Sequence, residues 1–107
     1  MVKPVSLLLL LLVPGLALAE VPEVQLRIKD HRFIPAEVRV PAKQRVKLIV
    51  TNEDPTPEEF DSYALNREKV LAGNTRGFVY IGPLEPGRYE FIGEFHAATA
   101  KGVVIAE

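Results

Sequence analysis

Apolar and polar residues alternate along most of the chain after residue 20, with the period of two that is typical of half-buried β-strands. Many of the apolar residues are β-branched or aromatic, which suits a pleated sheet. The strand segments that we expect are marked by Val24, Leu26, Ile28, Val38, Val40, Val46, Leu48, Val50, Phe78, Val79, Tyr80, Ile81, Tyr89, Phe91, Val103 and Ile105.

Turn motifs rich in proline and glycine separate these segments. They are Pro35-Ala36, Pro41-Ala42, Gly73-Asn74, Gly82-Pro83 and Glu85-Pro86-Gly87. The stretch Ser62 to Leu71 is ambiguous and fits either a helical turn or a short irregular strand. Six or seven short strands at this spacing predict an all-β fold built as a two-sheet sandwich.

The first 19 residues have the features of a secretory signal peptide, with Lys3 followed by an apolar run from Leu7 to Val13. The motif Ala17-Leu18-Ala19 supplies a cleavage site with small residues. The apolar run is shorter than the roughly 20 residues that span a bilayer, which disfavours the alternative of a retained anchor. We therefore expect a signal peptide at 1–19, a domain at 20–107, export to the periplasm and no membrane insertion after cleavage.

The charge and sulfur content of the expected domain limit the partners and the metals that it can bind. It carries 12 basic and 14 acidic residues, and this near balance argues against nucleic acid or anionic lipid as a partner. The sequence has no cysteine, and its single methionine is Met1. The domain must therefore be stabilised by packing without disulfides, and it offers no sulfur ligand to a metal.

Three segments in order resemble the cupredoxins. Phe33 to Ala42 matches F-x-P-x-x-[IV]-x-V-P-A, Val46 to Asp54 is similar to the strand that ends in N-x-D, and Pro83 to Phe91 matches P-x-x-P-G-x-Y-x-F. The resemblance covers nearly all of the expected domain. It implies a cupredoxin-like Greek-key β-sandwich of about seven strands.

Carrying the cupredoxin copper ligands onto this chain retains one ligand of four. The later histidine position falls on His96, the cysteine position on Gly93, the methionine position near Val103 and the earlier histidine position on Glu58. A blue copper centre needs a thiolate. Because the expected domain has none, its composition excludes blue copper electron transfer.

A narrower resemblance concerns Thr56 to Ser62, Leu65 to Lys69 and Gly93 to His96. These segments are similar to the cupredoxin-like proteins of periplasmic iron-uptake systems, including the small partner of Ftr-type iron permeases and the amino-terminal domain of EfeO-type proteins. This resemblance implies binding of copper or iron and a role in oxidising ferrous iron before transport.

An acidic run predicts a candidate metal site. Glu53, Asp54, Glu58, Glu59 and Asp61 fall within nine positions, in a loop that a cupredoxin-like sandwich places beside the loop of His96. Alternation would aim one of Glu58 and Glu59 away from any shared site. If residues 94–96 continue an extended strand, the side chains of Glu94 and His96 share a face.

The candidate ligands are therefore His96, Glu94, Glu58, Glu59 and Asp61. One imidazole with several carboxylates suits Fe(II), Fe(III), Mn(II) or Cu(II) and does not suit Cu(I). We expect one non-blue copper or iron ion. The alternative is an ordinary solvated acidic loop.

Other side chains are assigned more ordinary positions. We interpret His31 as a surface residue at the start of the second strand, which becomes at most a weak ligand if the fold brings it to the same end as His96. Arg67 and Glu68 fit either a charged surface loop or, in the case of Arg67, a group that holds a ligand carboxylate.

The leading hypothesis is a periplasmic metal-binding protein that acts in ferrous iron uptake, and it includes a role as the ferroxidase partner of a membrane iron permease. The alternatives are a metal-free protein-docking module and a Cu(II) carrier. A metal titration distinguishes the first hypothesis from the docking module.

Overall fold

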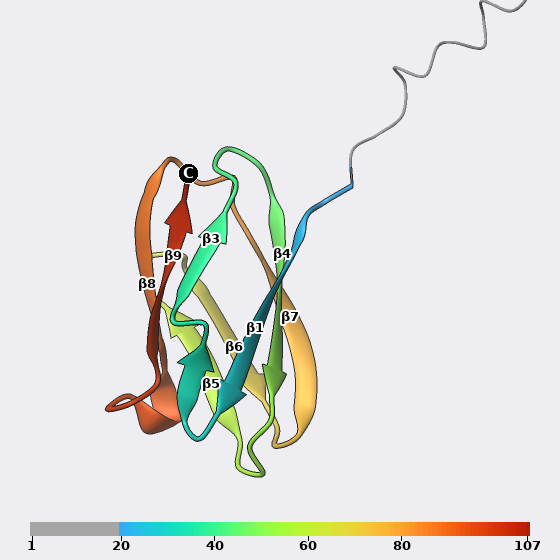
Figure 1. Ribbon diagram of the computed structural model, residues 1–107, viewed down its shortest axis with the longest axis vertical. Helices are drawn as coiled ribbons and strands as arrows, with labels where there is room; N and C mark the ends of the chain where they lie inside the picture. The colour runs from blue at the N-terminus through green and yellow to red at the C-terminus, as the bar shows by residue number, and fades with distance from the viewer. Residues whose placement is uncertain (1–19) are drawn as a thin grey trace, which may run out of the picture.

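The computed structural model describes residues 20–107, which form a β-sandwich of two sheets (Figure 1). The prediction of a signal peptide at residues 1–19 lies outside the described residues. The elements are β1 (Glu23–Lys29), β2 (Arg32–Ile34), β3 (Glu37–Val40), β4 (Val46–Asn52), β5 (Glu58–Ser62), β6 (Arg67–Leu71), β7 (Thr75–Ile81), β8 (Gly87–Gly93), the 3-10 helix η2 (Glu94–His96) and β9 (Lys101–Ala106).

The strand order is β2-β1-β4-β7 in one sheet and β3-β9-β8-β5-β6 in the other. Two pairs are parallel, β1 with β4 and β3 with β9, and the remaining pairs are antiparallel. Parallel neighbours require the chain to cross between the sheets instead of folding as consecutive hairpins. The architecture confirms the predicted all-β sandwich.

The core lies between the sheets and consists mainly of the residues that alternate inward from each strand. Phe33, Phe60 and Phe91 form a cluster in this core, with ring centroids 4.8 Å apart for Phe33–Phe91 and 5.0 Å for Phe60–Phe91. Burial of each such ring contributes about 2 kcal/mol to folding. This aromatic cluster supports β2, β5 and β8 close to the site described below.

Several local expectations need correction. In β9 the core-facing residues are Val104 and Ala106, so the predicted alternation of Val103 and Ile105 is out of phase by one residue. The ambiguous stretch from Ser62 contains the turn 63–66 and then β6. Residues 20–107 contain nine strands, more than the six or seven expected. The alternation did not predict β2, β5 and β6, because these strands are short or polar.

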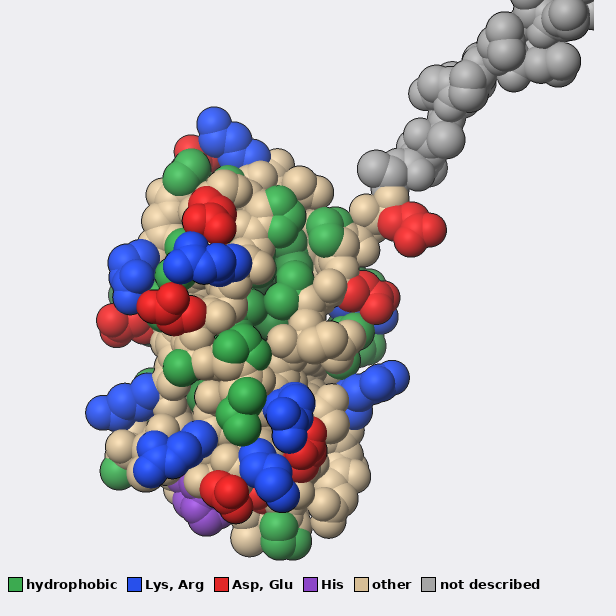
Figure 2. Space-filling model, viewed as in Figure 1, with side chains coloured by type: hydrophobic (Ala, Val, Ile, Leu, Met, Phe, Trp, Pro, Cys, Tyr) green, Lys and Arg blue, Asp and Glu red, His purple; other side chains and the backbone are tan. Residues whose placement is uncertain are grey.

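One end of the sandwich gathers three connections, which we call the histidine pole: the turn 30–31, the loop 53–57 and residues 94–100. Hydrogen bonds join them, since His31 N–H donates to Asp54 and Thr99 Oγ1 donates to the His31 carbonyl at 2.6 Å. In the view of Figure 2, the visible histidine surface lies at this end. No helix within residues 20–107 has the length and apolar character needed to cross a membrane.

Candidate functional site

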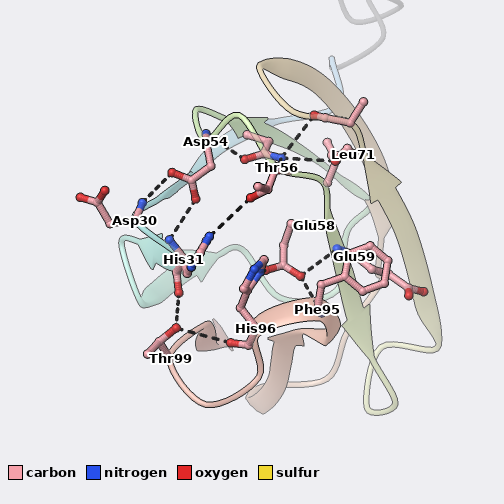
Figure 3. A network of polar contacts seen from close by, with 12 residues as sticks. Asp30, His31, Asp54, Thr56, Glu58, Glu59, Leu71, Phe95, His96 and Thr99 are labelled. Carbon is pink, nitrogen blue, oxygen red and sulfur yellow. Dashed lines mark hydrogen bonds and ion pairs between the residues drawn. The ribbon is translucent and has the colours of Figure 1, made fainter.

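Glu58 is the buried centre of the histidine pole (Figure 3). It begins β5 with its side chain turned inward and is only 1% exposed. Its Oε1 accepts the backbone N–H groups of Glu59 at 2.9 Å and Phe95 at 2.8 Å. Its Oε2 lies 2.7 Å from Nδ1 of His96. These partners replace the water that the carboxylate loses on burial.

The contact with Glu58 orients the His96 ring. An ionised carboxylate can only accept, so we assign the hydrogen on Nδ1 to His96, which donates it to Glu58. In the neutral ring, Nε2 then carries the lone pair. The side chain of His96 is 27% exposed, so the ring is reachable from solvent. A histidine that donates one ring N–H to a carboxylate and keeps the other nitrogen free has the arrangement of a metal ligand.

His31 also belongs to this pole, where it lies partly exposed and beside His96. Its ring stacks on that of His96, with centroids 3.6 Å apart and an interplanar angle of 11° (Figure 3). Its Nε2 lies 3.4 Å from Thr56 Oγ1, a long contact that holds the ring weakly. Two imidazoles that are far apart in the sequence therefore share one face of the site.

The two-residue turn between β1 and β2 places His31. Asp30 and His31 have φ of 54° and 59°, the left-handed values that both central residues of a type I′ hairpin turn require. Asp54 accepts the N–H of Asp30 at 2.8 Å and that of His31 at 2.9 Å. Burial opposes ionisation of Asp54, but these two amide hydrogen bonds, together with the charges of His31 and Lys29, lower its pKa.

Asn52 fixes the loop that precedes Glu58. It is 1% exposed, and its side-chain amide donates to the Thr56 carbonyl at 2.9 Å and also faces the carbonyls of Leu71 and Ala72. Its Oδ1 accepts the N–H of Asp54 at 3.0 Å. Asn52 of the N-x-D motif thus fixes the loop 53–57 and orients Asp54, whose carboxylate supports the turn of His31.

Gly93, the position of the cupredoxin cysteine, has no free space for a side chain because Glu58 and Ala100 lie against it. A Cβ added to Gly93 would lie 2.7 Å from Cδ of Glu58 and 2.7 Å from Cβ of Ala100. The Glu58 carboxylate therefore occupies the space that a thiolate would need. Val103, the residue nearest the methionine position, lies on β9 outside the buried core cluster. The pole does not fit a blue copper ion.

The five acids of the acidic run have different partners. Glu53 pairs with Arg27, with Oε1 2.9 Å from Nη2, and this hydrogen bond lowers the pKa of Glu53. Asp54 supports the turn of His31, and Glu58 holds His96. Glu59 and Asp61 alternate with buried residues of β5 and lie outside the sandwich. The fold separates the run instead of gathering it around one ion.

Glu59 and Asp61 belong to an outer acidic group together with Glu68 and Glu94. A hydrogen bond shared with Glu68 raises the pKa of Glu59, and partial desolvation and the charges of Glu68, Asp61 and Glu94 raise it further. The expectation that residues 94–96 continue an extended strand is wrong, because they form η2. Glu94 is exposed on this turn beside Glu59 rather than beside the His96 ring nitrogens.

Arg67 hydrogen-bonds to backbone carbonyls near β6 and β7 and does not hold a candidate ligand carboxylate. Its Nε donates to the Tyr80 carbonyl at 2.7 Å and its Nη1 to the Asn66 carbonyl at 2.8 Å. Among residues 20–107, no group of three or more His, Cys, Asp or Glu side chains is arranged to hold a metal ion. The imidazoles of His31 and His96, with Glu58 behind them, remain the donors that the pole can present.

These donors suit a non-blue ion. Imidazole nitrogen and carboxylate oxygen are ligands of Cu(II), for which a thiolate is not required. The two rings are parallel, so their lone pairs lie in separate planes. One ring must turn for both to bind the same ion, and the weakly held His31 ring is the freer of the two.

Sequence comparison places the chain near one family and one relative. The family model for the cupredoxin-like domain matches residues 4–106. The uncharacterized protein RP394 of Rickettsia prowazekii (strain Madrid E) is 45% identical over 83 residues, which cover 78% of this chain. The matched region spans 66% of that relative's length, less than two thirds of it.

Solved structures show the same fold at low sequence identity. Auracyanin A, a "blue" copper protein from Chloroflexus aurantiacus, matches with a TM-score of 0.70 at 14% identity, covering 82% of this chain and 100% of its own. The metal-binding domain of the Cu(I)-exporting P-type ATPase CopA from Streptococcus pneumoniae D39 matches with a TM-score of 0.69 at 13% identity, covering 85% and 99%. The resemblance to cupredoxins is confirmed, and the narrower resemblance to iron-uptake proteins stays a prediction.

Proposed function

Because the chain belongs to the cupredoxin-like domain family, we propose that it binds one copper ion at the histidine pole through imidazole nitrogen, without a thiolate. The observation that carries this proposal is the 2.7 Å contact between His96 Nδ1 and the buried Glu58 carboxylate. It directs Nε2 of His96 outward beside the stacked ring of His31. When bound, copper would supply a non-blue, one-electron redox centre.

Each residue of the pole has a separate task in this proposal. His96 and His31 would hold the ion. Glu58 would position His96, since both of its oxygens are already engaged by hydrogen bonds. Asp54 would hold the turn that presents His31. Loss of a carboxylate that orients a metal-bound histidine commonly weakens binding by about 10- to 100-fold.

The proposal is tested by titrating the protein with Cu(II) and measuring heat and visible absorption. We expect saturable binding of one ion and no intense copper–thiolate absorption. His96→Ala should lose saturable binding and Glu58→Gln should weaken it by about tenfold or more. Glu59→Gln is the matched control, because it changes the adjacent carboxylate outside the pole and should keep the affinity. Unchanged affinity in His96→Ala would exclude this site.

A narrower proposal follows from the sequence resemblance. We infer export to the periplasm and a role in ferrous iron uptake that includes acting as the ferroxidase partner of a membrane permease. Oxidation of each Fe(II) to Fe(III) releases one electron, which dioxygen can accept. The outer acidic group offers oxygen ligands that favour Fe(III), but it lies apart from the imidazoles.

The iron role is tested with the copper-loaded protein, Fe(II) and dioxygen. We expect Fe(III) formation to exceed the protein-free rate and to fall to that rate in His96→Ala. Copper binding without any such acceleration would favour the Cu(II) carrier instead.

A further inference from the structure

The outer side of β4 and β7 carries positive and aromatic side chains together. These strands belong to the sheet that does not contain Glu58. Arg45, Lys47 and Arg76 supply the charge, and Phe78 and Tyr80 supply the rings. Strand pairing sets Lys47 opposite Tyr80. We call these five residues the basic face. Its rings belong to the outward set of β7, because the residues that alternate with them are buried in the core.

Two cation–π contacts fix the cations of the basic face. Arg45 Cζ lies 3.9 Å from the centroid of the Tyr80 ring, and Lys47 Nζ lies 4.4 Å from that of Phe78. The two rings meet edge to face at 5.5 Å. A long cationic side chain that is already ordered loses less conformational entropy when it binds a partner. Phe78 remains 46% exposed, so apolar contact area is also available.

A small hollow opens within this face. It has a volume of about 110 Å³ and is lined by Lys47, Ile49, Arg76, Gly77 and Phe78. Since one water takes about 30 Å³ of liquid volume, the hollow has room for a group of a few heavy atoms, such as a carboxylate. Two cations and one aromatic ring border it, and Ile49 is buried although it faces outward.

The arginines of the basic face lack the acidic partners that Arg27 and Arg39 have. Arg27 pairs with Glu53, and Arg39 pairs with Glu107 at 3.0 Å. Within residues 20–107, Arg45 and Arg76 form no ion pair, and Lys47 has only Glu23 at the limiting distance of 4.0 Å. The positive charge of this face is therefore left for an external group.

We propose that the basic face docks an acidic segment of a partner protein. One glutamate or aspartate carboxylate of the partner enters the hollow between Lys47 and Arg76, and its aliphatic neighbours cover Phe78. A protein carboxylate fits better than a polyanion or an anionic bilayer, because the hollow is small and the whole chain has a net charge of −1. This docking is independent of the proposed copper site.

The test uses the full chain and a synthetic peptide of alternating glutamate and glycine with blocked ends, labelled for fluorescence anisotropy. We expect saturable binding that weakens as NaCl rises from about 20 mM to about 200 mM. Lys47→Glu with Arg76→Glu should weaken binding at least about tenfold, because like charges then meet in the interface. The control is Arg88→Glu with Lys101→Glu, which makes the same charge change on the other sheet. Phe78→Ala adds a variant without charge change.

The outcomes separate this proposal from its competitors and from the copper site. A small effect of the control with a large effect of the basic-face variant supports the proposal. Equal losses in both double variants would show a response to net charge alone and overturn it. Absence of saturable peptide binding, or binding to anionic vesicles of phosphatidylglycerol in its place, would overturn it too. The basic-face variant should keep its Cu(II) affinity, so the two proposals fail separately.

Discussion

Glu58 and Glu59 are consecutive residues of one strand, yet their environments are opposite. Glu58 is buried and accepts two amide hydrogen bonds and one from an imidazole. Glu59 lies outside among Glu68, Asp61 and Glu94, whose charges help to raise its pKa. A strand sends neighbouring side chains to opposite faces, so one acidic run supplies both a buried positioning group and a repulsive surface group.

The comparison of Glu58 with Glu59 shows that residue types alone do not decide whether the acids of the run share one site. Five acids beside one histidine favour an oxygen-rich iron site if all of them converge. The fold instead directs one carboxylate to the histidine and adds a second histidine from a distant turn. This change moves the expected metal site from an oxygen-rich iron site toward a copper site bound by imidazole.

The largest expected effect is on Glu58. Glu58→Ala removes the partner of two amides and of His96, and we expect the free energy of unfolding to fall by about 3 kcal/mol. Glu59→Ala should leave stability unchanged or raise it, because it removes a repelled charge. Urea unfolding of both variants measures the difference. Equal losses would mean that the two carboxylates do not differ as described.

Gly93 gives a second way to test the buried side. In Gly93→Ala, the added Cβ would meet Cδ of Glu58 at 2.7 Å and force a rearrangement. Overpacking of this kind costs about 2 kcal/mol. The control is Gly87→Ala at the other end of β8, where the nearest atom would be 3.8 Å away. If Gly93→Ala were as stable as the control, the Glu58 carboxylate would not fill the cysteine position.

Asp54 sharpens the comparison through its pH dependence. Asp54→Asn should cost about 1.5 kcal/mol at neutral pH, because the two N–H groups of the turn use different carboxylate oxygens and asparagine replaces one of these with an NH2 group that cannot accept. The folded protein lowers the pKa of Asp54. Its stabilising effect is therefore present above the unfolded value of about 3.9 and is lost as the pH falls through the lower folded value. The deficit of the variant should shrink there, and a constant deficit would contradict this account.

The smallest effect is expected for Glu59→Gln. Since the folded protein raises the pKa of Glu59, its ionised form opposes folding above that value. The variant should therefore melt slightly higher than the wild type at neutral pH, and the advantage should disappear as the pH falls through the raised pKa. Thermal melts at several pH values measure this. A variant that melts lower at neutral pH would contradict the repulsion.

Much of the fold follows from local patterns in the sequence. Alternation located β1, β3, β4, β7 and β8, because each buries one face. It missed β2, β5 and β6, which are short or contain charged residues on both faces. In β9 the adjacent valines Val103 and Val104 leave it ambiguous which of them faces the core, and the structure places Val104 there.

The site was predictable only in part. Motif positions brought Glu58 and His96 together, and the structure places them in contact. The sequence does not favour His31 as a ligand, because its approach to His96 depends on the parallel pairing of β1 with β4, which sets Ile28 opposite Asn52. The two-residue turn Asp30-His31 was the available signal, but a turn alone does not show which loop it meets. Glu94 was misplaced because η2 breaks the expected strand.

The central claim is that two imidazoles and no thiolate hold the ion at the histidine pole. Pulsed electron paramagnetic resonance of the Cu(II)-loaded protein tests it most directly, since the modulation from remote imidazole nitrogens counts the bound rings. We predict two imidazoles in the wild type, one in His31→Ala and an unchanged pair in Glu59→Gln. A spectrum with no imidazole modulation, or one that His31→Ala leaves unchanged, would contradict the account.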